Sequence, residues 1–303
     1  MRRTSEGVCM KLYPLFFEAN FHAALWGGEE WLVSGHHTSP SVIANGSLKG
    51  RTLEWAAAEF GRDLMGERAP SDMRFPLLFK MIDAHDRLSV QVHPNEQTAK
   101  TAGGEPKTEM WYVLGHPAPI YAGLAAGTTP ADVESAVHTG RFEEIVVKHD
   151  ARPGDVLFIP GGLVHAIGAG ARVYEVQQSS NTTYRLYDWG RVGADGRPRA
   201  LHVAESLKTI DFSLPVPEPI AAVDCPFFRF APRDLSEPVD LPADAATFRV
   251  LYAAEGSASL AWDGGAAPLA NGRAVLVPAG VAVRVAPDGR ARLLVTALPN
   301  LAY

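Results

Sequence analysis

The chain of 303 residues is 47% apolar and carries a formal net charge of -6. Its length predicts one large domain or two domains of ordinary size, and so apolar a chain is not intrinsically disordered. The mild acidity argues against the basic, clustered surface of nucleic-acid-binding proteins, so no nucleic-acid partner is expected.

Cysteine content and the N-terminal sequence predict a cytoplasmic protein with no membrane partner. Cys9 and Cys225 are far apart and lack a Cys-x-x-Cys spacing, which disfavours a disulfide scaffold and a thiolate zinc site. The apolar stretch near the N-terminus is broken by Pro14 and stopped by Glu18, unlike a signal peptide. Residues 110–131 lack Asp, Glu, Lys and Arg but contain glycines and prolines, so we expect two buried strands and a turn there.

Short strands dominate the predicted elements, because β-branched or aromatic runs recur between Gly, Pro and Asp residues. In chain order we expect a helix at 53–61, strands at 75–82, 88–92, 108–115 and 118–125, a helix at 129–140, and strands at 144–149, 155–160 and 172–178. The second helix has Thr129 as N-cap, Pro130 in the first turn and Gly140 past its end. Many short strands with few short helices predict a mainly β protein of sandwich or jelly-roll type.

An internal repeat predicts two similar β-barrels. Gly154, Pro160, Gly162 and His165 follow the same spacing as Gly272, Pro278, Gly280 and Val283. The proline-rich stretch 211–226 is the expected linker, so we expect a catalytic domain over residues 1–210, with N-terminal strands and short helices, and a degenerate C-terminal barrel over 211–303. The alternative is that Pro-x-Gly turns, which are common in β proteins, recur without a duplication.

His165 is the first candidate for a metal ligand. The spacing of Pro160, Gly162 and His165 resembles the second motif of the cupin proteins, in which the strand after the turn points its histidine into the barrel mouth. Gln91 and His93 lie two residues apart on a predicted strand, so both project from the same face.

Glu109 begins another predicted strand and completes a set of nitrogen and oxygen ligands with Gln91, His93 and His165. Zinc accepts imidazole and carboxylate ligands and keeps an open position for water or substrate in catalytic sites. Gln91 is the weakest member, since an amide oxygen is a poor ligand. Glu96 is the alternative carboxylate, but it falls in a stretch that we interpret as an inserted helix and loop.

Four blocks of the sequence resemble class I mannose-6-phosphate isomerase, the zinc-dependent, cupin-type family, in its short bacterial form. These blocks read "FPLLFKMIDAHDRLSVQVHP", "KTEMWYVL", "PGDVLFIPGGLVHAI" and "EVQQSSNTTYRLYDWGR", and "FHAALWGGEEW" resembles the family's N-terminal strand. The resemblance implies a tandem cupin fold of two jelly-roll barrels, with metal ligands Gln91, His93, Glu109 and His165. It implies a catalytic role for Arg185 and substrate contacts for Ser89 and Lys107. The loop before Lys107 is longer than is usual in the family.

The implied reaction interconverts mannose 6-phosphate and fructose 6-phosphate by proton transfer through a cis-enediol. One zinc ion per chain is expected, because no histidine follows His202 and the second copy of the repeat ends in Val283. A metal-dependent cupin dioxygenase and a non-catalytic phosphosugar-binding protein are the alternatives. The sequence does not identify the proton-transferring base, the exact sugar phosphate or the oligomeric state.

Overall fold

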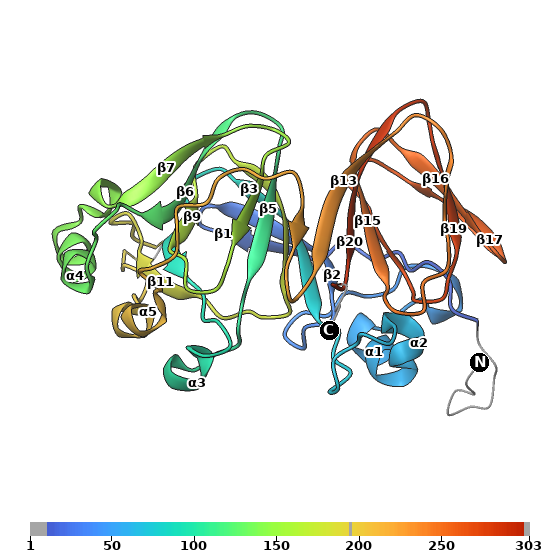
Figure 1. Ribbon diagram of the computed structural model, residues 1–303, viewed down its shortest axis with the longest axis horizontal. Helices are drawn as coiled ribbons and strands as arrows, with labels where there is room; N and C mark the ends of the chain where they lie inside the picture. The colour runs from blue at the N-terminus through green and yellow to red at the C-terminus, as the bar shows by residue number, and fades with distance from the viewer. Residues whose placement is uncertain (1–10, 194–195, 300–303) are drawn as a thin grey trace. The chain divides into compact units, whose positions relative to one another are not determined.

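Two compact units, each built mainly from antiparallel strands, make up the protein. The computed structural model describes residues 11–193 and 196–299. Within that range, the central unit comprises residues 21–30 and 79–220, and the terminal unit comprises residues 11–20, 31–78 and 221–299. The strands in Figure 1 confirm the expected mainly β fold.

The central unit is formed around two antiparallel sheets. One sheet has the strand order β1 (Phe21–Ala24), β2 (Gly27–Ser34), β3 (Leu77–Ala84), β10 (Arg172–Gln178), β5 (Glu109–Leu114) and β8 (Val156–Ile159). The other has the order β11 (Tyr184–Tyr187), β4 (Val90–Val92), β9 (His165–Ile167), β6 (Ala118–Leu124) and β7 (Val146–Ala151). The predicted strands of residues 75–178 are thus confirmed, with boundaries that shift by one or two residues.

An apolar core fills the space between these two sheets. Ile82, Trp111 and Val173 from the six-stranded sheet pack in one cluster with Ile120 and Ile167 from the five-stranded sheet. Side chains along a strand alternate between its two faces, so residues two positions away from these also face the interior. Polar residues at such positions are placed inside the sandwich, and they form the site described below.

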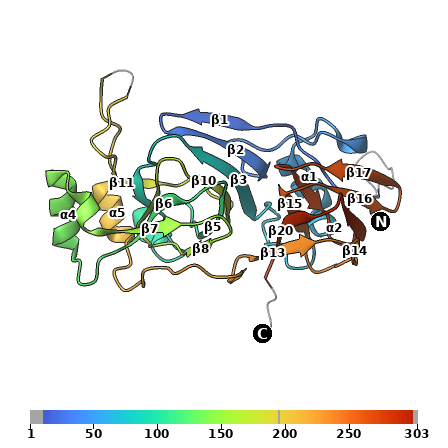
Figure 2. The ribbon, with the colours of Figure 1, turned by 90° about the horizontal axis from the view of Figure 1, so that it is seen from above.

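Helices cover the outer face of the five-stranded sheet (Figures 1 and 2). Val133 of α4 (Pro130–Thr139) and Leu207 of α5 (Val203–Thr209) belong to a second cluster with Val90 and Val92 of β4. The helix expected at 129–140 is confirmed with its cap, since the Thr129 side chain accepts from the backbone N–H of Asp132 and the Asp132 carboxylate accepts in return. Because Val90 and Val92 face the helices, Gln91 between them faces the interior.

The terminal unit contains a further pair of antiparallel sheets. The first sheet has the strand order β12 (Val223–Asp224), β13 (Arg229–Leu235), β20 (Ala291–Ala297), β15 (Arg249–Glu255) and β18 (Ala274–Val277). The second has the order β14 (Val239–Leu241), β19 (Val283–Pro287), β16 (Ala258–Trp262) and β17 (Gly265–Leu269). The predicted helix at 53–61 is confirmed as α1 (Leu53–Phe60) and is followed by α2 (Arg62–Met65). Residues 31–78 belong to the same compact unit as the C-terminal strands. The compact units are therefore not two continuous halves of the chain separated at residue 210. That boundary stays a prediction.

The repeated glycine–proline turn leads to a strand in both units. β8 is followed by β9, which begins at His165, and β18 is followed by β19, which begins at Val283. Gly162 and Gly280 have φ of 97° and 72°, a region that side chains with a Cβ avoid, so glycine is needed at each turn. Val283 is 2% exposed and packs in the apolar core of its unit. His165, at the matching position of the central unit, faces polar groups instead.

The remaining elements are short. They comprise the helix α3 (Ala99–Ala102) and the 3-10 helices η1 (Gly46–Leu48) and η2 (Phe142–Glu144). The helix and loop that we expected around Glu96 correspond to α3 and its flanking turns. None of the helices in the described ranges is long and apolar enough to span a membrane.

Candidate metal centre

Adjacent strands bring the predicted site residues into one row inside the central unit. Gln91 of β4 lies opposite His165 of β9 on one side and opposite Arg185 of β11 on the other. His93 follows Gln91 by two residues and therefore lies on the same face of the chain. From the facing sheet, β5 contributes Glu109, which lies opposite Gln177 of β10.

The two histidines face each other through their Nε2 atoms, which are 3.1 Å apart. His93 donates its Nδ1–H to the carbonyl oxygen of Thr182 at 2.9 Å, and His165 donates its Nδ1–H to that of Leu163 at 2.8 Å. In the neutral imidazole the other nitrogen then carries a lone pair, so two lone pairs lie close together, and Lys107 Nζ lies 3.2 Å from the Nε2 of His93. Such an arrangement is repulsive unless a cation or a proton lies between them.

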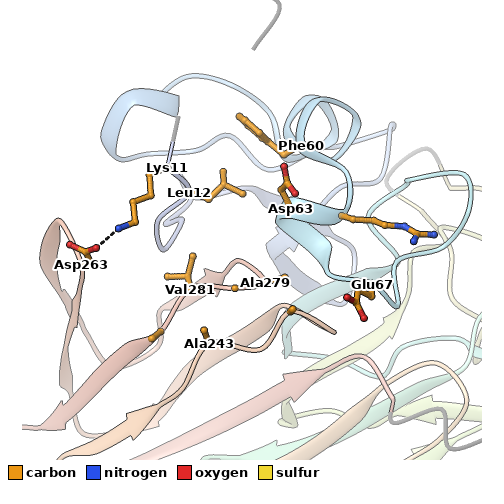
Figure 3. Close-up of a pocket in the computed structure, with 13 residues that line it drawn as sticks. Lys11, Leu12, Phe60, Asp63, Glu67, Ala243, Asp263, Ala279 and Val281 are labelled. Carbon is orange, nitrogen blue, oxygen red and sulfur yellow. Dashed lines mark hydrogen bonds and ion pairs between the residues drawn. The ribbon is translucent and has the colours of Figure 1, made fainter. Parts of the chain in front are cut away.

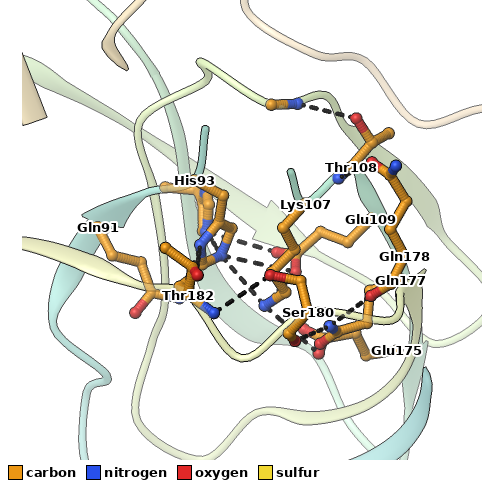
Figure 4. Close-up of polar contacts among 12 residues, drawn as sticks. Gln91, His93, Lys107, Thr108, Glu109, Glu175, Gln177, Gln178, Ser180 and Thr182 are labelled. Atoms are coloured by element: carbon orange, nitrogen blue, oxygen red, sulfur yellow. Dashed lines mark hydrogen bonds and ion pairs between the residues drawn. The ribbon is translucent and has the colours of Figure 1, made fainter. Parts of the chain in front are cut away.

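Glu109 is the carboxylate of the cluster, and Figure 4 shows it converging with His93 and Lys107. Its oxygens lie 3.4 Å from His165 Nε2 and 3.7 Å from His93 Nε2, and Lys107 Nζ lies 2.7 Å from Oε2. Glu109 is fully buried, and Oε1 has no hydrogen-bond donor within the part of the chain that the structure describes. A buried carboxylate oxygen without a donor is costly, and a metal ion at this position would remove that cost.

Gln91 completes the expected ligand set at the edge of this cluster. Its Nε2 lies 3.4 Å from His165 Nε2. Because the two ends of an amide are nearly equal in shape, a half-turn of the side chain places Oε1 there instead. The amide oxygen would then lie beside the Nε2 of His165, next to the cluster.

Burial sets the protonation of these groups. Burial lowers the pKa of His165 to about 3, and burial together with the charge of Lys107 lowers the pKa of His93 well below its usual value. Both imidazoles are thus neutral at pH 7, which is the form that binds a metal. Burial and the nearby charge of Glu175 raise the pKa of Glu109 to about 7, with Lys107 opposing the shift.

The residues present fit a zinc ion. Ligand atoms of His93, Glu109 and His165 all lie within 4.8 Å of one another. In a tetrahedral zinc site with ligands at about 2.1 Å, neighbouring ligand atoms are about 3.4 Å apart, close to the separations found here. The set contains imidazole and carboxylate donors and no thiolate, which suits a catalytic rather than a structural zinc site.

A pocket in the central unit lies beside this cluster and contains the other predicted residues. Gln91, Lys107, Ser89 and Arg185 all line it. Ser89 and Lys107 are 4% and 5% exposed, so both are held at the pocket wall rather than on the outer surface. The structure thus brings together all seven residues that the sequence singled out.

Lys80 and Glu175 also line this pocket and were not singled out from the sequence. Lys80 Nζ forms ion pairs with Glu29 Oε2 at 3.3 Å and Glu175 Oε1 at 3.6 Å. Trp111 Nε1 donates to Glu175 Oε2 at 2.9 Å and so fixes the carboxylate. The signal in the sequence is a single charged residue within each of two apolar strands, "FPLLFKMI" and "RVYEVQQ".

The contacts of Arg185 differ from an ordinary surface ion pair. Its Nη1 donates to the carbonyl oxygen of Ala200 at 3.0 Å, while Asp188 forms its ion pairs with Arg199 and Arg191. Burial and the charge of Arg199 lower the pKa of Arg185, which stays a cation at neutral pH. Arg185 is therefore a cation at the pocket wall whose charge is not cancelled by a direct carboxylate partner within the described ranges.

A larger cavity, of about 610 Å³, lies in the terminal unit (Figure 3). Its charged lining residues include Lys11 and Asp263, which form an ion pair with each other, and Asp63 and Glu67, whose side chains are exposed. Among the described residues that line it, none is a buried titratable group or a histidine. The chemistry of the lining residues therefore identifies the smaller pocket of the central unit as the candidate site.

Glu109→Gln is expected to lower metal affinity by more than about 100-fold. The loss should be larger than for a residue that only hydrogen-bonds to a ligand, because Glu109 itself is expected to bind the metal. Glu96→Gln is the matched control, since Glu96 is exposed and accepts a hydrogen bond from Gln178 Nε2 at 2.9 Å outside the cluster. Metal content by mass spectrometry and turnover together make the test. If Glu96→Gln lost its metal and Glu109→Gln retained it, the carboxylate of the site would be Glu96.

Comparisons with known proteins agree with this geometry. The family model of the phosphomannose isomerase type I catalytic domain matches residues 22–112. Mannose-6-phosphate isomerase ManA of Bacillus subtilis is 39% identical over 224 aligned residues, which cover 67% of this chain and 69% of the relative. Mannose-6-phosphate isomerase of Streptococcus mutans is 37% identical over 222, with the same two coverages. The crystal structure of the mannose 6-phosphate isomerase from B. subtilis has a TM-score of 0.83 and 28% identity, covering 94% of this chain and 99% of that chain.

Proposed function

This chain belongs to the type I mannose-6-phosphate isomerase family, and we propose that it interconverts mannose 6-phosphate and fructose 6-phosphate by zinc-assisted 1,2-proton transfer. As a member of this family it is an aldose–ketose isomerase, rather than a cupin dioxygenase or a non-catalytic phosphosugar-binding protein. The observation that carries the proposal is the pair of Nε2 atoms of His93 and His165, which face each other beside the buried carboxylate of Glu109.

Gln91, His93, Glu109 and His165 would hold the zinc ion, which would supply a Lewis acid for the sugar oxygens on which negative charge develops. The protein's part is to hold these four side chains at fixed positions. Hydrogen bonds from His93 to Thr182 and from His165 to Leu163 fix the orientation of each ring and the nitrogen that carries its proton.

The proton transfer needs acid–base groups near the sugar carbons. In the proposed reaction the proton on C2 of the aldose moves to a base, the carbonyl oxygen on C1 gains a proton, and the cis-enediol then receives a proton at C1 as the oxygen on C2 loses its own. Lys80, Lys107 and Glu175 are the buried acid–base groups that line the pocket. Burial alone would lower the pKa of Lys107, but Glu109 and Glu175 outweigh it and raise the pKa, so Lys107 carries its proton at neutral pH.

Arg185 and Ser89 orient and stabilise the substrate in this proposal. Arg185 is a cation on the strand next to Gln91, so it can stabilise negative charge on the enediol oxygens. Ser89 precedes Gln91 by two residues, and its hydroxyl lies on the same pocket wall, where it can bond a sugar hydroxyl. Lys107 lies on the same pocket wall, and its ammonium group can donate hydrogen bonds to substrate oxygens.

Solvent deuterium tests the proton transfer directly. With mannose 6-phosphate in D₂O, the fructose 6-phosphate formed over many turnovers is expected to carry deuterium at C1, because a proton held on a side chain exchanges with solvent. His165→Ala is the control. Because this variant is expected to lose turnover, any deuterium that enters the sugar in its presence comes from exchange that the enzyme does not catalyse. Complete conversion with no deuterium incorporated in either direction would indicate a hydride shift and contradict the cis-enediol route.

A further inference from the structure

Hydrogen bonds join the loop of residues 102–105, which follows α3, to the segment of residues 180–184 that leads into β11. The backbone N–H of Glu105 donates to Thr182 Oγ1 at 2.9 Å, and the carbonyl oxygen of Glu105 accepts from Ser180 Oγ at 3.0 Å. The partners of these two bonds are 77 and 75 residues apart in the chain. The loop therefore fixes a segment with which it has no local connection.

Thr182 connects this loop to the metal-ligand cluster (Figure 4). Its carbonyl oxygen accepts the Nδ1–H of His93 at 2.9 Å, and His93 is only 1% exposed. That hydrogen bond determines which nitrogen of His93 keeps its lone pair and in which direction the lone pair points. A displacement of Thr182 would therefore turn the Nε2 of His93 away from the position that it shares with the other ligands.

The beginning of the segment is held separately, by β10. Gln177 Nε2 donates to the carbonyl oxygen of Ser180 at 2.7 Å, and both residues are fully buried. Ser180 Oγ in turn accepts from the backbone N–H of Thr182 at 3.2 Å. Asn181 and Thr183, on either side of Thr182, line the pocket. The side chain of Thr182 is thus held from the loop, while the chain before it is held from the sheet.

The loop lies close against Thr182, and glycine at position 104 makes this possible. Gly104 has a φ of 73°, and a Cβ at this position would lie 2.5 Å from Thr182 Cγ2 and 2.9 Å from Thr182 Oγ1. Threonine is branched at Cβ and rotates little about χ1, and its hydroxyl is bonded to Glu105. A side chain at position 104 would therefore force the loop and Thr182 apart.

We propose that the loop of residues 102–105 is a positioning element of the metal site, which acts through Thr182 to hold His93 in its metal-binding orientation. This inference rests on the proposed function, because the role of His93 as a zinc ligand is part of that proposal. Thr182 and Gly104 are then positioning residues rather than ligands. A ligand that is held in place before the metal arrives binds it more tightly, so the loop should raise zinc affinity.

The zinc affinity of the metal-stripped protein, measured by competition with a chromophoric chelator, tests the proposal. Thr182→Val keeps the shape of the side chain but removes the acceptor for the Glu105 N–H, and we expect the Kd for zinc to rise about 10-fold. Thr182→Ser keeps the hydroxyl, so its Kd should stay within about twofold of wild type. Gly104→Ala, which pushes on Thr182 from the loop, should raise the Kd by about 10- to 100-fold.

Gly115→Ala is the matched control for Gly104→Ala. Gly115 has a similar φ of 77°, but a Cβ there would meet nothing within 4 Å, so the variant has comparable backbone strain and displaces no neighbour. Its Kd for zinc should stay within about twofold of wild type.

An unchanged Kd in Thr182→Val or in Gly104→Ala would overturn the proposal. So would an equal loss of affinity in Thr182→Ser or in Gly115→Ala, which would show general destabilisation of the unit. If Gly104→Ala does not fold, the comparison of Thr182→Val with Thr182→Ser still decides. Failure of the proposed function would be seen separately, as a wild-type protein that binds zinc but does not turn over mannose 6-phosphate.

Discussion

His165→Ala is expected to lose its bound metal and to lower turnover of mannose 6-phosphate by at least about 10³-fold, because Lewis-acid stabilisation contributes several kcal/mol. His93→Ala should behave in the same way, since its Nε2 lies 3.1 Å from that of His165. Each variant should still fold, because the strands that carry these residues are held by apolar clusters on both faces of the sheet. Metal content by mass spectrometry, turnover and thermal unfolding are the measurements.

His116→Ala is the control for the two histidine variants. His116 is exposed in the turn between β5 and β6, away from the cluster, so its removal should leave metal content and turnover unchanged. Full zinc occupancy in purified His165→Ala or His93→Ala would remove that residue from the ligand set. Loss of metal in His116→Ala as well would point to instability of the whole unit rather than to a lost ligand.

Arg185→Ala is expected to keep its metal and to lower kcat by about 10² or more, as for the loss of a group that stabilises developing charge. The physical reason is its position: Arg185 lies opposite Gln91 on the next strand and lines the pocket, while its guanidinium offers no lone pair to a metal ion. Steady-state kinetics and metal analysis on the same preparation separate the two effects. A rise in KM with unchanged kcat would show that Arg185 contributes uniform binding, and the catalytic role would be wrong.

The sequence could predict much of the central unit because the relevant patterns are local. The alternation of side chains along a strand places Gln91 and His93 on one face, and the glycine–proline turn places His165 at the first residue of β9. The capped helix after Thr129 is another local pattern, and it is present as expected. These features depend on residues that are near one another in the chain.

Lys80 and Glu175 could not be predicted because their proximity depends on pairing between distant strands. The order β3–β10–β5 brings them beside Lys107, and nothing local to either strand specifies that order. The ion pair of Asp188 with Arg199 likewise joins two residues on either side of a loop, and sequence patterns are weakest in loops. The grouping of residues 31–78 with the C-terminal strands is a long-range feature of the same kind.

Removal and return of the metal test the central claim most directly. The claim is that one zinc ion per chain, held by Gln91, His93, Glu109 and His165, is required for isomerisation. Within residues 11–193 and 196–299, no group of three potential ligands includes a residue beyond His165, so a second site in the C-terminal strands is not expected. We predict that a chelator abolishes turnover of mannose 6-phosphate and that about one equivalent of zinc per chain restores it. Full turnover by the metal-stripped protein, or a requirement for two tightly held equivalents, would contradict the account.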